Sequence, residues 1–216
     1  MTKGANTMPN WTYNEMKFES KKDFERIVKE CVRGKHFDFN TVVPMPKIIE
    51  DTEAGSVEHD LLKFAENLKQ KHSPEETVEL YINKINAKEA KARIFDDNQK
   101  RKLANSLKAL EQYGIADWYD WACIYWGTKW NACETEISKE ENTISFYTAW
   151  CPPGAFYEAF AKKYPDIRCE IYARNEDAGE DYGVYDISIQ DGAINIEHHG
   201  LNEEELAELR EWENEG

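Results

Sequence analysis

The order in which strand-like and helix-like segments follow one another constrains the fold of this 216-residue chain more than any single motif. Trp11 to Phe18 is expected to form a strand. Phe24, Ile27, Val28 and Cys31 then recur at helical spacing behind a serine cap, and Gly34 can end that helix. The chain is therefore expected to begin with a strand followed directly by a helix.

The same alternation returns in the C-terminal half. Residues 144–150 alternate as a strand, residues 155–164 have the apolar spacing of a helix ended by Pro165, and residues 167–173 alternate again. If residues 132–138 form one further strand, the order becomes β-α-β-β-α-β, the split unit of ferredoxin-like folds. The sequence therefore predicts an α+β fold in which helices cover one face of an antiparallel sheet.

Two more strands are predicted beyond this unit. Residues 182–190 and 193–198 flank the dipeptide Asp191-Gly192, which is the strongest short hairpin signal. A short helix is expected next, because Leu201 can pack on Leu206 while Asn202 and Glu205 occupy the cap and the third helical position. The hairpin should extend the sheet, and the helix should end the chain.

Between the two halves the pattern is helical from about residue 51 to residue 114, with three apolar stripes and a capping box at Ser73. The segment before it, residues 37–46, carries two prolines and is expected to leave the main domain in an extended form. The predicted organisation is a discontinuous ferredoxin-like domain at 1–50 and 115–199, a helical insertion at 51–114, and an acidic C-terminal helix at 200–216.

The formal charge of −15 is concentrated at one end of the chain. Residues 166–216 hold 16 acidic residues against three arginines, a net of −13, which leaves only −2 for residues 1–165. Clustered carboxylates repel phosphate backbones and attract basic partners over about a Debye length. Direct binding of nucleic acid to this end is disfavoured, although part of the insertion is locally basic, as a solvated helix face often is.

Four strings carry a family resemblance: MPNW at 8–11, FDFNTVVPMP at 37–46, WGTKWNA at 126–132 and TAWCPP at 148–153. In this order they resemble the YubB family, also described as Api-type phage proteins with a ferredoxin-like domain. The resemblance implies a product of a phage, plasmid or integrated element, with a fold that agrees with the pattern above. It implies no activity and no cofactor.

The tryptophan-rich strings allow two interpretations. Trp126, Trp130 and Trp150, with Lys129 and Asn131 between them, could form a surface that stacks bases or anchors a protein. Large aromatic residues at the junction of a strand and a loop are more often core, with the asparagine bonding a turn. Exposure of the three indoles beside Lys129 distinguishes the two interpretations.

Catalytic and metal-binding signatures are absent from the sequence. It contains no G-x-S-x-G, H-E-x-x-H, P-loop or Rossmann string. Asp117 and Asp120 could be paired carboxylates, but acids at this spacing are usually a solvated helix edge. The acidic stretch 176–183 lacks the spacing of a calcium loop and is expected to be a surface loop.

The histidines and cysteines likewise give no sign of a metal site or of disulfide bonds. His198 and His199 are adjacent on a strand and should face opposite sides, and no Cys or His sits at ligand spacing from them. The five cysteines are an odd number with wide spacings and are expected to be free thiols. We therefore expect no enzyme, no metal and no cofactor.

The function predicted from the sequence is a non-enzymatic accessory protein that binds a host protein. The partner is expected to be a host nuclease or defence complex, and imitation of DNA by the acidic end is one mechanism by which the chain could inhibit it; contact through the helical insertion stays open. The residues expected to bind it are Glu203, Glu204, Glu205, Glu208 and Glu211. The tryptophan cluster, by which we mean Trp126, Lys129, Trp130, Asn131 and Trp150, is expected to contribute as well. The alternative is a nucleic-acid or nucleotide binder that uses the sheet and the basic insertion. Without a signal peptide or an apolar run, the chain is expected to be cytoplasmic, with no membrane contact.

Overall fold

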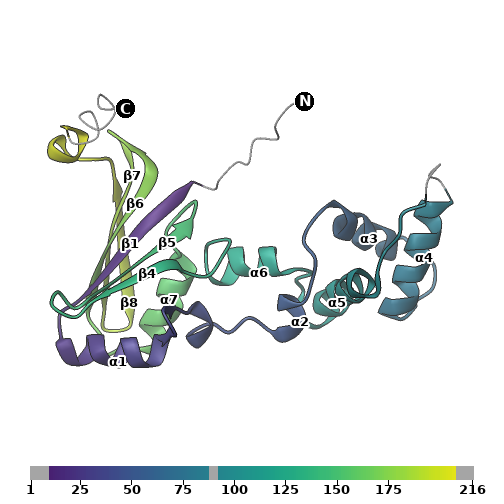
Figure 1. Cartoon of the computed structure of the whole chain (residues 1–216), viewed down its shortest axis with the longest axis horizontal. Helices are drawn as coiled ribbons and strands as arrows, with labels where there is room; N and C mark the ends of the chain where they lie inside the picture. The colour runs from purple at the N-terminus through teal and green to yellow at the C-terminus, as the bar shows by residue number, and fades with distance from the viewer. Residues whose placement is uncertain (1–9, 88–91, 208–216) are drawn as a thin grey trace. The chain divides into compact units, whose positions relative to one another are not determined.

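The computed structural model describes residues 10–87 and 92–207, and they form two compact units (Figure 1). One unit combines residues 1–44 with residues 124–216 and contains a six-stranded sheet, so we call it the sheet unit. The other comprises residues 45–123 and is helical, so we call it the helical unit. Each unit is described separately below.

The sheet unit has the predicted ferredoxin-like arrangement. The six elements of the β-α-β-β-α-β unit are β1 (Trp11–Phe18), α1 (Lys21–Cys31), β4 (Cys133–Ser138), β5 (Thr143–Ala149), α7 (Gly154–Lys163) and β6 (Cys169–Gly179). The strand order is β4-β5-β1-β6, and each neighbouring pair is antiparallel. The first strand therefore lies between the third and fourth strands of the β-α-β-β-α-β unit, and the prediction of this fold is confirmed.

The predicted hairpin extends the sheet beyond β6. β7 (Tyr182–Gln190) pairs with β6, and β8 (Ala193–His199) pairs with β7 and ends the sheet. Asp191 and Gly192 form the two-residue loop between them, and both have positive φ angles of 52° and 76°. Two positive φ angles define a type I′ turn, which is why an Asp-Gly dipeptide is favoured there.

Helices α1 and α7 cover one face of the sheet (Figure 1). Their inward side chains meet the buried positions of the strands, and the large buried residues in this layer include Phe24, Ile27, Met16, Phe146, Phe156, Tyr157 and Phe160. A polar network is buried in the same layer. The Asn14 amide donates to the Thr148 hydroxyl at 2.9 Å, and the Tyr157 hydroxyl donates to the Asn14 carbonyl oxygen at 3.0 Å. Because each group has a partner, the network does not carry the desolvation cost of an unpaired polar group.

The segment at residues 37–46 differs from its prediction. Instead of leaving the domain at once, it forms β3 (His36–Phe37), which pairs with β2 (Val32–Arg33), and then a 3₁₀ turn, η1 (Phe39–Thr41). Phe37 and Phe39 are wholly buried, and Phe39 stacks on Phe156 with ring centroids 4.2 Å apart. The apolar residues hold the chain in the core, and only residues from 45 onward belong to the helical unit.

The helical unit consists of α2 (Lys47–Glu50), α3 (Ser56–Glu66), α4 (Pro74–Asn86), α5 (Asp97–Tyr113) and most of α6 (Trp118–Tyr125). Its core is a cluster of buried residues from α3, α4 and α5: Leu61, Val78, Tyr81, Ile82, Leu103 and Ala104. Ser73 and Glu76 form the capping box of α4, and Gly114 ends α5 with a φ of 72°. The unit extends beyond the predicted insertion at both ends, because α2 contacts α5 and the Trp118 amide donates to Thr52.

The C-terminal helix begins as predicted. The Asn202 side chain accepts from the amides of Glu204 and Glu205, and the Glu205 carboxylate accepts from the Asn202 amide. Residues 203–207 are helical, and residues 208–216 lie outside the described part of the chain. Within the described residues, no helix combines the length and the apolar character needed to span a membrane.

Candidate functional site

The side of the sheet that α1 and α7 do not cover, which we call the open face, carries three rows of side chains. On β1 these are Tyr13, Glu15 and Lys17, which alternate with the buried Asn14 and Met16. Strand pairing then fixes which residue of each neighbouring strand stands beside them. The candidate site follows from reading these rows across all six strands.

The middle row is acidic. Following the register from β4 to β8, it contains Glu136, Ser145, Glu15, Tyr172, Asp186 and Glu197. Four of the six are carboxylates, and none is basic. We call this set the acidic row. Because neighbouring strands lie about 4.8 Å apart, these charges form a line across the sheet rather than a random scatter.

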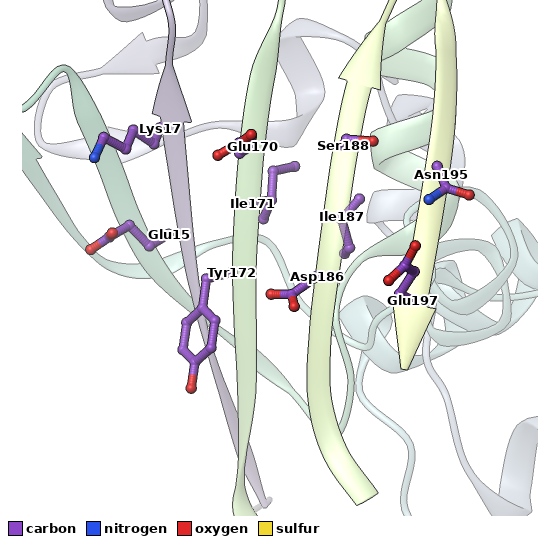
Figure 2. Close-up of a pocket in the computed structure, with 10 residues that line it drawn as sticks. All are labelled: Glu15, Lys17, Glu170, Ile171, Tyr172, Asp186, Ile187, Ser188, Asn195 and Glu197. Carbon is purple, nitrogen blue, oxygen red and sulfur yellow. The ribbon is translucent and has the colours of Figure 1, made fainter. Parts of the chain in front are cut away.

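The rows on either side do not neutralise the negative charge of the acidic row. Lys17 stands beside Glu170 in one row, and Tyr13 stands beside Arg174 in the other. The sheet is hollowed here by about 480 Å³, with a lining from β1, β6, β7 and β8 that includes Glu15, Glu170, Asp186 and Glu197 (Figure 2). The figure shows Lys17 as the one basic side chain among the ten lining residues. The hollow therefore suits a cationic occupant.

Two tyrosine hydroxyls hold carboxylates of this face in place. The Tyr13 hydroxyl donates to Glu15 at 2.8 Å, and the Tyr172 hydroxyl donates to Glu205 at 2.7 Å. Burial, followed by these hydrogen bonds to carboxylates, raises the pKa of each tyrosine to about 12. Both hydroxyls therefore stay protonated near neutral pH and keep orienting their carboxylates.

His199 lies at the β8 end of the open face. Its Nδ1 lies 2.6 Å from the Gly200 carbonyl oxygen, and its Nε2 lies 3.0 Å from Asp186. These two hydrogen bonds raise its pKa, because both acceptors favour the doubly protonated ring. Among the described residues, no group of three or more His, Cys, Asp or Glu is placed to hold a metal ion, so neither His198 nor His199 belongs to one. His198 instead accepts from the Gly183 amide.

The start of the C-terminal helix covers one corner of the open face. Leu201 is buried in a small cluster with Ala178 and Val184, and Leu206 and Tyr172 pack against it. Glu203 and Glu204 are exposed. Glu208 and Glu211, which the sequence also singled out, lie outside the described residues. The described glutamates of this helix therefore add charge to one edge of the open face.

The tryptophan cluster divides into core and surface. Trp126 is 5% exposed, its indole N–H donates to the Val43 carbonyl at 3.0 Å, and its ring packs edge-on against Phe39. Asn131 is structural, because its side-chain oxygen accepts from the amides of Phe39 and Ala132. These two residues belong to the core and the turn rather than to a binding surface.

Trp150 and Lys129 remain at the surface. Trp150 is 42% exposed and is held at a φ of 72°, in the left-handed region that a tryptophan rarely adopts. The Lys129 ammonium lies 4.3 Å from the ring centre of Trp130 and 5.2 Å from that of Trp150. Trp130 also contacts Trp11, with centroids 6.0 Å apart. The lysine is thus stabilised by two indoles through cation–π contacts.

The acidic pair at Asp117 and Asp120 is not the solvated edge that its spacing predicts. Asp117 is buried and caps α6 by accepting from the amides of Tyr119 and Asp120. Near it lies Glu58 of α3, which is 4% exposed and has one carboxylate oxygen without a hydrogen-bond partner. Burial, with Asp117 and then Asp120 as further causes, raises the pKa of Glu58 to about 7. The sequence signal for Glu58 is its position three residues before Leu61, on the apolar stripe of α3.

Comparison with known families agrees with the ferredoxin-like fold of the sheet unit. Residues 126–215 match the family model of the ferredoxin-like domain in Api92-like proteins. The Api-type part of the resemblance is therefore confirmed for this region. The Api92-like match begins at Trp126 and contains β4, β5, α7, β6, β7 and β8. In this chain β1, which stands between β5 and β6, comes from outside the matched region.

Among solved structures, the chain is similar to the crystal structure of a protein Api92 from Yersinia pseudotuberculosis. The TM-score is 0.46 at 10% sequence identity, and the similarity covers 90% of this chain and 99% of that one. Curated proteins show no match to the sequence.

Proposed function

We propose that this chain is a non-enzymatic accessory protein that binds a basic protein partner through the open face of its sheet. The observation that carries the proposal is the acidic row, where four of six aligned residues are carboxylates and none is basic. Aligned charges act together on a partner because their fields add within a Debye length of about 8–10 Å.

The class of partner follows from the charge. Proteins that handle nucleic acid display lysine and arginine for a polymer with about one negative charge per 1.7 Å of duplex axis. A line of carboxylates spaced by adjacent strands can occupy such a surface in place of DNA. In its full form, the proposal is of a phage or mobile-element product that inhibits a host nuclease or defence complex by DNA mimicry.

A second candidate function has one specific observation in its favour. Trp150 is substantially exposed beside the Lys129 ammonium, which is the pairing that stacks a base and contacts a phosphate. The acidic row opposes this candidate on the rest of the open face, because carboxylates repel a phosphate backbone. The two candidates use different residues and can be tested together.

The test compares three forms of the tagged protein in affinity capture from nuclease-treated host lysate. The open-face variant E15Q/D186N/E197Q removes three charges of the acidic row while amides keep the hydrogen-bond acceptors of Glu15 and Asp186. The matched control D60N/E66Q/E140Q removes three exposed acids that lie outside this row. Bound proteins are released with rising salt and identified by mass spectrometry.

The proposal expects one stoichiometric protein bound by the wild type and by the matched control, shed as salt rises, and lost from the open-face variant. Equal capture by the open-face variant contradicts it. Retention of nucleic acid when nuclease is omitted, abolished by Trp150→Ala and Lys129→Ala, supports the second candidate instead.

A further inference from the structure

The outer edge of β8 has backbone groups that the sheet leaves available. In a type I′ hairpin the residues flanking the loop, Gln190 and Ala193, form a hydrogen-bonded pair, and such pairs then alternate along the ladder. The N–H and C=O groups of Ile194, Ile196 and His198 consequently point away from β7. None of the backbone hydrogen bonds between the described elements involves these three residues.

The opposite edge of the sheet is protected. β4 contains a register shift between Cys133 and Glu136, with Glu134 at a positive φ of 48°. Its Thr135 hydroxyl accepts from the Phe37 amide, so the β3 segment lies against it. Bulges and covering segments are the usual means of preventing strand addition. β8 has neither a bulge nor a proline nor a lysine, and its register with β7 is regular.

The two faces of β8 have opposite chemistry. Asn195 and Glu197 lie on the open face, and Glu197 stands beside Asp186. Ile194 and Ile196 point to the other face, where Ile196 is 47% exposed because no further strand shields it. An added strand would therefore meet carboxylates with one set of alternate side chains and isoleucines with the other.

We propose that β8 receives an extended segment of the basic partner as a seventh, antiparallel strand, in which lysine or arginine alternates with apolar residues. The inference rests on the proposed function for the charge of the partner and adds how it is held. Main-chain hydrogen bonds along β8 give the segment its register, and the alternating side chains give it specificity.

The register can be stated in detail. The partner residue opposite Ile196 forms a hydrogen-bonded pair and is apolar. The residue opposite Glu197 forms a non-hydrogen-bonded pair, in which side chains approach more closely, and is basic. In such a segment the amides of the apolar residues point to β8, and the amides of the basic residues point to solvent.

This alternation provides a test that leaves the charge and the side chains of the peptide unchanged. The probe is the capped peptide Lys-Val-Lys-Val-Lys-Val-Lys with a fluorescent dye, and its affinity for the full chain is measured by fluorescence anisotropy. One derivative is N-methylated at its three valines, which removes the amides facing β8. The matched control is N-methylated at three lysines, which removes amides facing solvent.

We expect the valine-methylated peptide to bind at least about tenfold more weakly than the parent, because several hydrogen bonds are lost. The lysine-methylated peptide should stay within about twofold, because its lost amides have no partner on β8. Equal affinities for all three peptides overturn the inference, since binding would then be electrostatic without strand pairing. Failure of the parent peptide to bind also overturns it.

A pair of protein variants separates this inference from the proposed function. Ile196→Pro removes an outward N–H without removing a bond to β7, and Ile196→Ala makes a similar loss of side chain while keeping that N–H. We expect Ile196→Pro to weaken parent-peptide binding about fivefold or more relative to Ile196→Ala. If Ile196→Pro captures the host protein normally and the open-face variant does not, the acidic face binds the partner without strand addition.

Discussion

The buried network around Asn14 in the sheet unit and the buried carboxyl group of Glu58 in the helical unit differ in how their polar atoms are satisfied. In the sheet unit, Asn14, Thr148 and Tyr157 form a network in which every side chain has a partner, while the carboxylates of the acidic row stay at the surface. In the helical unit, Glu58 is buried beside Asp117 with a carboxylate oxygen unpaired. The Asn14 network should therefore stabilise the sheet unit equally at any pH near neutral. The stability of the helical unit should depend on whether Glu58 is protonated.

The largest expected effect tests whether the two units have independent cores. Phe39→Ala should destabilise the sheet unit by about 3–5 kcal/mol, because it removes a wholly buried ring that stacks on Phe156. Segment-resolved hydrogen exchange should show faster exchange in β1, β5 and β6, with α4 and α5 unchanged. Leu61→Ala is the matched change in the helical unit and should give the reverse. Equal loss of protection in both units after Phe39→Ala would contradict the separation.

The next largest effect is expected in the buried hydrogen-bond network of Asn14, Thr148 and Tyr157. Asn14→Leu should cost about 2–3 kcal/mol, because it leaves the Tyr157 hydroxyl without its buried acceptor and takes a donor from Thr148. Tyr157→Phe should cost only about 1 kcal/mol, since it removes one hydrogen bond without adding bulk. Urea unfolding should give the same difference at pH 5 and pH 8. A loss that changes with pH would show that an ionisable group belongs to the network.

A smaller, pH-dependent effect is expected in the helical unit. Because burial raises the pKa of folded Glu58 to about 7, the native state holds a proton that the unfolded chain releases near pH 4.5. The stability associated with that proton is fully present below about pH 4.5 and is lost as pH rises to about 7. Glu58→Gln should remove this slope and raise stability at pH 8 by roughly 1–2 kcal/mol. Urea unfolding at pH 5 and pH 8 checks it, with Glu66→Gln as the exposed control.

The smallest effect on stability should come from the residues that matter most for binding. The E15Q/D186N/E197Q variant should unfold within about 0.5 kcal/mol of the wild type, because surface substitutions away from packed groups have small effects. Thermal unfolding measures this directly. A loss of several kcal/mol would mean that the acidic row is part of the architecture, and the comparison between the two units would no longer hold.

Much of the sheet unit is visible in the sequence because its signals are local. Alternation marks β5 and β6, Asp191-Gly192 marks the hairpin, and the Asn202 cap marks the last helix. The position of β3 and η1 could not be predicted, because the prolines near residue 45 signal an end to regular structure but not the burial of Phe37 and Phe39. That burial depends on the distant partners Phe146 and Phe156.

The sequence indicates only part of the candidate site. The concentration of acid after residue 166 includes Asp186 and Glu197, and the structure places both in the acidic row. Glu15 and Glu136 join them only through the strand register, which no local signal defines. The tryptophan strings predict either a core cluster or a binding surface, and the structure contains both. The indoles differ in burial according to the strands and loops around them.

The central place of β1 has a consequence for how the chain is made. Its hydrogen-bonding neighbours β5 and β6 lie beyond residue 142, so the first strand leaves the ribosome long before either neighbour exists. At typical rates of synthesis this delay is on the order of ten seconds. During it the helical unit, which is contiguous in sequence, can fold alone, while β1 lacks both neighbouring strands and Phe18 has only nearby residues of α1, such as Phe24, to contact. Newborn chains should therefore depend on chaperones until the last third has been translated.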